Sequence, residues 1–335
     1  MTLQNPDTTA PQRRAAGLDA ALRAASHQAI ACGSKSFHTA SRLFDARTRD
    51  SVVMLYAWCR HCDDVVDGQQ FGFGQSASDP ALAQQRVQGL IDITERVLRG
   101  GLAPSRPFEA LAEVVRLHRI PRRFLLEHLS GFGMDAQGRR YDTLADTLDY
   151  SYRVAGVVGL MMGMIMGRRD DATLDRAADL GLAFQLSNIA RDVVDDHAAG
   201  RVYLPAAWLH EAGLAHDTLA LSGNRPALAG VARRLVDAAE PYYASAQVGI
   251  DALPLRSACA VSAALRIYRD IGLQVAARGA AAWDVRVASS RRHKLLHLCN
   301  GVFAAAVLKT GLSPRAAAAA PRERLWMRPR RESAG

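Results

Sequence analysis

Helical spacing of apolar residues runs through almost all of this 335-residue chain. Apolar side chains recur at intervals of three and four residues, which places them on one side of an α-helix. The predicted helices are 16–31, 48–67, 80–99, 106–118, 121–131, 143–167, 172–196, 223–247, 256–277 and 286–310. No run of five or more residues alternates between apolar and polar side chains as a half-buried strand does. The sequence therefore predicts an all-α protein.

The chain carries no sign of a boundary between two domains. Hydrophobic residues make up 49% of it, which is enough for one large core, and no linker rich in Gly, Pro or Ser interrupts it. We expect a disordered N-terminus over residues 1–15, a single all-α domain over 16–312 and a mobile Arg/Ala/Pro-rich tail over 313–335. The N-terminus has no apolar secretion signal. The longest apolar run, 154–167, is shorter than the roughly 20 residues that a membrane-spanning helix needs.

Charge and cysteine usage narrow the class of protein. The formal net charge is +9, but no basic run is interleaved with aromatic residues, so we do not expect nucleic acid as a partner. Five scattered cysteines favour reduced thiols and a cytoplasmic setting. Cys59 and Cys62 have the spacing of half a zinc site, but no second Cys or His pair accompanies them. Thiols in the core are the better interpretation of this pair.

Two short acidic blocks, residues 63–67 (DDVVD) and 192–196 (DVVDD), carry most of the chemical information. Each holds two aspartates four residues apart, and residues at that spacing lie on the same face of a helix. Asp63 with Asp67 and Asp192 with Asp196 would therefore form two carboxylate faces. Opposed to each other, such faces can hold hard divalent cations, above all Mg²⁺.

The spacing alone is weak evidence, because Asp142 and Asp146 share it. That pair precedes an apolar helix, and we interpret Asp142 as an N-cap and Asp146 as a first-turn acid. The two acidic blocks differ because apolar segments lead into them, and buried carboxylates are costly without a cation. An arginine accompanies each block, and guanidinium groups bind phosphate oxygens in pairs of hydrogen bonds. The sequence therefore predicts a metal and diphosphate site, with Asp64 and Asp195 at its periphery.

Two further segments leave alternatives open. Residues 33–37 (GSKSF) are a phosphate cradle in one interpretation and an ordinary helix cap in the other. Residues 157–167 hold four methionines and three glycines. They belong either to ordinary core or to an apolar channel for a polyprenyl chain.

At this point the residues resemble a known family. The motifs are SKSF (34–37), YAWCRHCDDVVDG (56–68), YSYRVAGVVGLMMGMIMG (150–167), GLAFQLSNIARDVVDDHAAGRVYLP (181–205) and RIY (266–268). They resemble those of the squalene/phytoene synthases, most closely the bacterial phytoene synthases, and extend over nearly the whole chain. The resemblance implies an isoprenoid-synthase fold of the class I terpenoid synthase type, a helical bundle around a central apolar cavity.

The resemblance also implies roles for individual residues. Metal would be bound by Asp63, Asp67, Asn188, Asp192 and Asp196. The catalytic set would comprise those four aspartates with Arg60, Arg191 and Tyr56. Substrate would be bound by Ser34, Lys35, Ser36, Phe37, Gln185, Asn188, Arg201, Tyr203 and Tyr268.

The implied reaction joins two geranylgeranyl diphosphates head to head, as in the first committed step of carotenoid biosynthesis. We expect Mg²⁺, with Mn²⁺ as a possible substitute, and no NADPH. The alternative is a squalene, dehydrosqualene or hydroxysqualene type of reaction on farnesyl diphosphate. A chain-elongating prenyltransferase would show an arginine pair after the first block, where GQQF stands instead. We further expect a monomer or weak dimer that associates peripherally with the inner face of the membrane.

Overall fold

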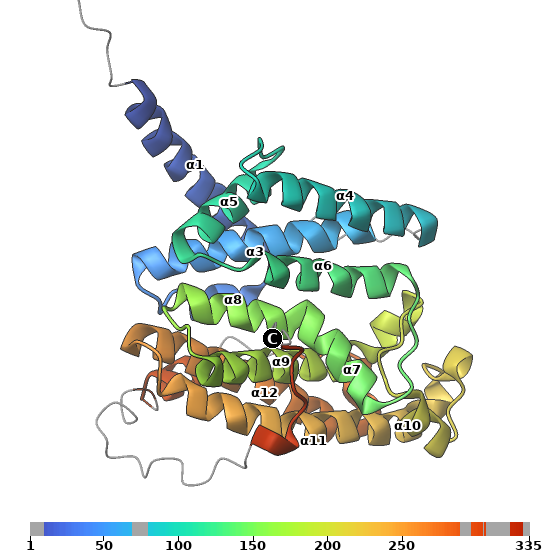
Figure 1. Ribbon diagram of the computed structural model, residues 1–335. Coiled ribbons are helices and arrows are strands. Elements are labelled where there is room, and N and C mark those ends of the chain that lie inside the picture. Colours follow the sequence, from blue (N-terminus) through green and yellow to red (C-terminus); the bar gives the residue numbers. More distant parts are fainter. Residues whose placement is uncertain (1–9, 69–79, 289–295, 304, 306–321, 331–335) are drawn as a thin grey trace, which may run out of the picture.

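The structure, a computed structural model, describes residues 10–68, 80–288, 296–303, 305 and 322–330. Within these ranges the chain forms helices and connecting turns and contains no strand, so the all-α prediction is confirmed. Figure 1 shows the helices stacked into one body, with the long helices α3, α6, α9 and α11 running across it.

The helix bounds agree with the sequence prediction for most of the chain. The α-helices are α1 (Ala10–Gly33), α2 (Lys35–Ser41), α3 (Ala46–Asp67), α4 (Pro80–Leu98), α5 (Arg106–His118), α6 (Arg122–Ala136), α7 (Leu144–Ser151), α8 (Val157–Ile165), α9 (Asp171–Ala198), α10 (Ala206–Glu211), α11 (Arg225–Ile250) and α12 (Leu255–Arg278). Helix α1 begins at Ala10, inside the stretch expected to be disordered. The helix expected at 286–310 is helical over 296–303, whereas 286–288 are not helical. The short helices α2 and α10 were not predicted.

Helix α9 lies at the centre of the bundle. It packs against α8 on one side and against α11 and α12 on the other (Figure 1). Helix α3 packs against α1 and α5, and α4 packs against α6. Trp58, Leu182 and Leu186 are fully buried between these layers. The two predicted aspartate pairs therefore lie near the C-terminal ends of two helices, α3 and α9, whose other faces are held by the core.

Close approach between α8 and α9 depends on glycine. A Cβ at Gly159 would lie 2.2 Å from the carbonyl oxygen of Ala177, and one at Gly181 would lie 2.3 Å from that of Ala155. The five residues before α8, Tyr152–Gly156, form a π-helical turn, so the predicted helix 143–167 is continuous but changes its winding. Gly159 and Gly181 thus allow the close contact between this segment and α9.

The N-terminal caps of α2 and α7 were both considered in the sequence analysis, and the structure agrees with it for α2 only. Ser34 caps α2, since its hydroxyl accepts a hydrogen bond from the backbone N–H of Phe37. The prediction for Asp142 was wrong, because Thr143 is the N-cap of α7. Thr143 forms a capping box with Asp146, which explains the acid in the first turn without any ligand.

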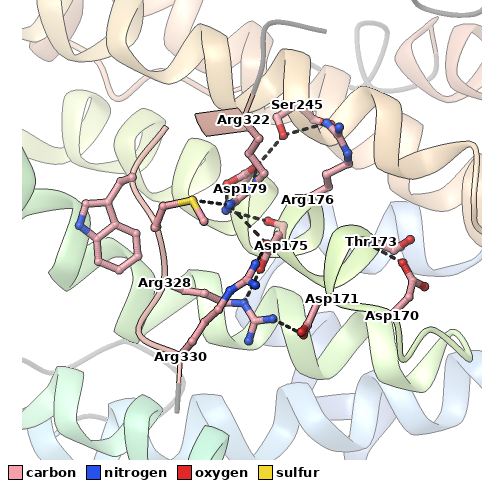
Figure 2. A network of polar contacts seen from close by, with 12 residues as sticks. Asp170, Asp171, Thr173, Asp175, Arg176, Asp179, Ser245, Arg322, Arg328 and Arg330 are labelled. Carbon is pink, nitrogen blue, oxygen red and sulfur yellow. Dashed lines mark hydrogen bonds and ion pairs between the residues drawn. The ribbon is translucent and has the colours of Figure 1, made fainter. Parts of the chain in front are cut away.

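The C-terminal segment 322–330 is the clearest departure from the sequence prediction of a mobile tail. Figure 2 shows Arg322, Arg328 and Arg330 of this segment directed at aspartates of α9. Arg328 is only 4% exposed, and the Trp326 ring packs against Tyr152 with 5.3 Å between ring centroids. Residues 322–330 are therefore held against the body by buried ion pairs. The rest of the predicted tail lies outside the described residues.

Candidate active site

A cavity of about 820 Å³ opens between the C-terminal halves of α3 and α9. Its wall holds every predicted site residue except Phe37: Ser34, Lys35, Ser36, Tyr56, Arg60, Asp63, Asp67, Gln185, Asn188, Arg191, Asp192, Asp196, Arg201, Tyr203 and Tyr268. These residues come from four stretches of the chain that are far apart in sequence, 34–36, 56–67, 185–203 and 268. The fold thus brings the predicted site together in one polar chamber.

A second cavity, an apolar tunnel of about 330 Å³, continues from the chamber into the bundle. The two cavities share wall residues, among them Tyr56, Asn188 and Tyr268. Phe37 lies in the tunnel, with 5.6 Å between its ring centroid and that of Tyr56. Phe184 stacks on Tyr268 at 4.2 Å between centroids. Aromatic faces therefore surround the place where the polar chamber meets the apolar tunnel.

The methionine-rich segment 157–167, for which the sequence left core packing and an apolar channel as alternatives, does both. Met161 is fully buried in the core, and Met164 is 5% exposed. Met162 and Met166 instead line the tunnel, together with Gly159. One helix therefore supplies core packing on one face and an apolar cavity wall on the other.

Arginines pair with the first aspartate motif. Arg60 Nη1 lies 2.6 Å from Asp63 Oδ2, and its Nε lies 3.3 Å from Asp64. Asp67 accepts hydrogen bonds from Arg201, which follows α9 in the chain and is 134 residues away. The loop after the second motif therefore reaches across the chamber to the first motif.

The second motif has a similar arrangement around Asp192 and a different one around Asp196. Asp192 accepts hydrogen bonds from Arg191 and, at 3.0 Å for each oxygen, from Arg286. Among the described residues, the Asp196 carboxylate has no hydrogen-bond or ion-pair partner. Arg286 follows α12 and lines the chamber.

The protonation of these carboxylates reflects their surroundings. Burial raises the pKa of Asp63 to about 6, although Arg60 opposes the shift. Burial and the charge of Asp192 raise the pKa of Asp196 to about 8. Burial would also raise the pKa of Asp192, but hydrogen bonds from Arg191 and Arg286 lower it instead. Asp63 and Asp196 thus lack full compensation for their negative charge within the protein.

The donor atoms in the chamber suit a hard divalent cation. Asn188 Oδ1 is buried and has no hydrogen-bond partner, and it lies on the wall that Asp192 and Asp196 also form. Carboxylate and amide oxygens are the ligands that Mg²⁺ takes in proteins. In the part of the chain that is described, no three His, Cys, Asp or Glu side chains approach closely enough to hold a metal ion as they stand. Arg60, Arg191, Arg201 and Arg286 occupy carboxylate oxygens instead.

Some residues of the chamber were not found from sequence. Asp135 of α6 accepts hydrogen bonds from the hydroxyls of Tyr150 and Tyr203, and it faces the chamber. It has no acidic partner four residues away, so no pattern marked it. Asp195, expected at the periphery, also lines the chamber. Arg286 was predicted as the first residue of a helix but lies outside any helix, so the prediction did not mark it as a residue of the chamber.

Three of the four residues set aside by the sequence interpretation, Asp142, Asp146 and Cys62, lie away from both cavities, whereas Cys59 lines them. Asp142 and Asp146 line neither the chamber nor the tunnel. Cys62 is a fully buried core residue, and burial raises the pKa of its thiol. Cys59 is on the wall shared by the two cavities, where burial again raises the thiol pKa.

Comparison with known proteins fits this geometry. The family model described as squalene/phytoene synthase matches residues 30–294. The chain belongs to the squalene/phytoene synthase family. The match covers both aspartate motifs and the tunnel, and it confirms the resemblance found from the sequence motifs. It ends before the C-terminal segment 322–330.

Within the squalene/phytoene synthase family, this chain shares high sequence identity with individual phytoene synthases. A 15-cis-phytoene synthase of Enterobacter agglomerans is 53% identical over 299 residues, which cover 89% of this chain and 99% of the relative. A 15-cis-phytoene synthase of Pantoea ananas is 52% identical and covers 90% and 96%. Among solved structures, a dehydrosqualene synthase superposes with a TM-score of 0.75 at 26% identity, covering 88% of this chain and 97% of that one.

These matches confirm the isoprenoid-synthase fold expected from the sequence. The polar chamber and the tunnel stand where the central cavity was predicted. None of the helices described is both long enough and apolar enough to pass through a lipid bilayer.

Proposed function

We propose that this protein is a prenyltransferase that condenses two geranylgeranyl diphosphates head to head to phytoene. The observation that carries the proposal is the direct connection between a chamber with two aspartate motifs and an apolar tunnel. Such a pair of cavities suits substrates with a diphosphate head and a long hydrocarbon tail. High identity to 15-cis-phytoene synthases over 89% and 90% of the chain supports the C20 substrate.

The reaction has two stages. In the first, the C1–O bond of one substrate breaks, and diphosphate leaves. The C2–C3 double bond of the second substrate attacks the allylic cation and a proton is lost, which gives the cyclopropyl compound prephytoene diphosphate. In the second stage, that diphosphate leaves, the cation rearranges, and loss of another proton gives phytoene. No hydride donor enters, so NADPH is not required.

Oxygen ligands at the chamber wall would hold the metal ions. We assign this role to Asp63, Asp67, Asn188, Asp192 and Asp196. Mg²⁺, or Mn²⁺ in its place, would draw negative charge from the leaving diphosphate when bound. The unpartnered Asn188 oxygen and the uncompensated Asp196 carboxylate support this assignment, because each needs a positive partner in its buried position.

Arginines of the chamber would receive the diphosphates. Arg60, Arg191 and Arg201 each pair with a motif aspartate. Their guanidinium groups would bond phosphate oxygens of a diphosphate held beside those aspartates. The Ser34, Lys35 and Ser36 stretch at the start of α2 adds a lysine and hydroxyls, with Gln185 and Tyr203 on the opposite wall.

Aromatic side chains at the junction of the chamber and the tunnel would protect the allylic cation from water. Tyr56, Phe37 and Tyr268 stand where the chamber meets the tunnel, so their ring faces can stabilise an allylic cation and exclude water. Because substrate and product are lipids, we also propose that the enzyme works in the cytoplasm against the inner face of the membrane, as a monomer or weak dimer.

A direct assay tests this function. Purified protein with Mg²⁺ is given the C15 or the C20 diphosphate, and the hydrocarbon product is sized by mass spectrometry. We expect a C40 hydrocarbon from the C20 substrate without NADPH. A C30 product from the C15 substrate, with none from C20, would instead assign the protein to the squalene or dehydrosqualene type. The dehydrosqualene synthase among its structural relatives favours that second candidate.

A further inference from the structure

The inner end of the apolar tunnel holds a charged residue that the proposed chemistry does not use. Among the described residues that line the tunnel, Arg176 of α9 is the one side chain with a full charge. Arg176 precedes Asn188, at the tunnel mouth, by twelve residues, or about 18 Å along the helix at about 1.5 Å per residue. The half-buried Arg176 therefore stands toward the end of the tunnel opposite the chamber, where the tail of a bound prenyl chain would end.

Contacts fix both parts of the Arg176 side chain. Its stem passes over Gly249 of α11, where a Cβ would lie 2.8 Å from the Arg176 Cβ. Its guanidinium turns to Ser245, donating from Nη1 to the carbonyl oxygen and to the hydroxyl, each at 3.2 Å. The hydrocarbon stem thus forms part of the tunnel wall while the guanidinium is held by Ser245.

Ser245 links Arg176 to the C-terminal segment. The Ser245 hydroxyl donates to Asp179 Oδ2, and Asp179 is fully buried. Arg322 then neutralises Asp179 with two hydrogen bonds of 2.9 Å, one to each carboxylate oxygen. Figure 2 shows this chain of contacts from Arg322 through Asp179 and Ser245 to Arg176.

The other two arginines of the segment bind Asp175, which Arg322 also approaches, with 3.4 Å between Arg322 Nη1 and Asp175 Oδ2. Arg328 and Arg330 both pair with Asp175, and Arg328 also reaches Asp171. Their ion pairs and hydrogen bonds within the described residues go to Asp171 and Asp175 and not to Asp179 or Ser245. Of the three arginines, Arg322 is therefore the one that pairs with Asp179 and so connects to the tunnel, whereas Arg328 and Arg330 hold the segment at Asp175 and Asp171.

We propose that Arg176 determines the length of prenyl chain that the tunnel accepts, and that Arg322 of the C-terminal segment positions it through Asp179 and Ser245. Without Arg322, the buried Asp179 loses its cation. The nearest replacement is Arg176, which already bonds the same serine hydroxyl. Its guanidinium would turn toward Asp179, the stem would leave its place over Gly249, and the tunnel would lengthen. The inference rests on the proposed use of the tunnel by a prenyl chain.

The test measures binding rather than turnover. The full-length protein is titrated by calorimetry, with Mg²⁺, against C15, C20 and C25 prenyl thiolodiphosphates, whose C1–S bond resists ionisation. We expect the wild type to bind the C20 compound at least about tenfold more tightly than the C25 compound, as a filled apolar pocket discriminates against added carbon. Arg176→Ala and Arg322→Met should each bring that ratio close to one.

Two further variants separate this mechanism from general loosening of the segment. Arg330→Met removes an arginine from the same segment but leaves Asp175 paired with Arg328, so it should keep the wild-type ratio. Asp179→Asn combined with Arg322→Met removes the charge that attracts Arg176 and should restore discrimination. If Arg176→Ala fails to fold, Arg322→Met and its rescue by Asp179→Asn carry the test.

Three results would overturn the proposal: equal binding of C20 and C25 compounds by the wild type, an unchanged ratio in a folded Arg176→Ala, or an equal change in Arg330→Met and Arg322→Met. Failure of the proposed reaction is distinguishable from these. A wild type that discriminates among the thiolodiphosphates yet forms no C40 hydrocarbon from the C20 diphosphate would refute the reaction and leave the tunnel inference standing.

Discussion

Replacing Gly159 with alanine tests whether the α8–α9 contact is as tight as the structure indicates. The added methyl group would lie 2.2 Å from the carbonyl oxygen of Ala177 and 2.9 Å from its carbonyl carbon. Both are backbone atoms of α9, so no side chain can turn away to make room. The two helices must separate until the distance to the oxygen is at least 3.0 Å.

The expected loss of stability follows from that separation. Overpacking a filled core costs about 1–3 kcal/mol, and a clash against backbone lies at the upper end. Alanine regains up to about 1 kcal/mol because it favours the helical backbone more than glycine does. We therefore expect Gly159→Ala to lower the free energy of unfolding by about 2 kcal/mol, measured by urea denaturation with a helical signal.

A matched control uses a helical glycine with space around it. Gly89 lies within α4, and an added Cβ there would meet no atom within 4 Å. Gly89→Ala should therefore stabilise the protein by up to about 1 kcal/mol. A Gly159→Ala protein as stable as the wild type, alongside a stabilised Gly89→Ala, would refute the close α8–α9 packing described here.

Three other perturbations have defined outcomes. Asp63→Ala or Asp192→Ala should reduce phytoene formation at least about a thousandfold while the helical signal stays intact. The control, Asp142→Ala at an exposed position, should have a turnover close to that of the wild type. Full turnover in either motif variant would contradict the two-motif site. Chelation of divalent cations should stop turnover. It should change the free energy of unfolding by less than about 1 kcal/mol, because arginines already pair with Asp63, Asp67 and Asp192. Unfolding on chelation would show instead that the metal is structural. Burial lowers the pKa of His128 to about 4 from 6.5, so the unfolded chain binds this proton first as the pH falls below 6.5. The stability that neutral His128 contributes is therefore present above pH 6.5 and is lost toward pH 4, with a loss of about 2 kcal/mol at pH 5. Urea denaturation of the wild type and of His128→Gln should show a smaller loss of stability between pH 7 and 5 in the variant.

Local signals in the sequence located the helices and the site because those signals act over a few residues. Helix α5 was predicted at its observed bounds because Gly100 and Gly101 precede it and Pro121 follows it. The aspartate motifs were found because four-residue spacing on an apolar helix is visible without any tertiary contact. Helices α2 and α10, with 7 and 6 residues, are too short for periodicity to be distinguished from a loop.

What the sequence could not provide were partners that lie far apart along the chain. Asp175 and Asp179 resemble the motif aspartates in spacing, but whether they bind metal or arginine depends on residues more than 140 positions later. The same holds for Asp67, whose partner Arg201 is 134 residues away. Composition made the C-terminal segment look like a solvated tail, because its arginines reveal nothing of the buried carboxylates that they meet.

The ion pairs of the C-terminal segment also affect the order of folding. Synthesis proceeds from the N-terminus, so α9 is made well before Arg322, Arg328 and Arg330. Until those arginines arrive, Asp175 and Asp179 cannot be buried as charged groups without a large penalty. The central helix of the bundle is therefore expected to reach its final packing only after the C-terminal segment is made, and a chain that stops short of residue 322 would leave Asp175 and Asp179 without their arginines.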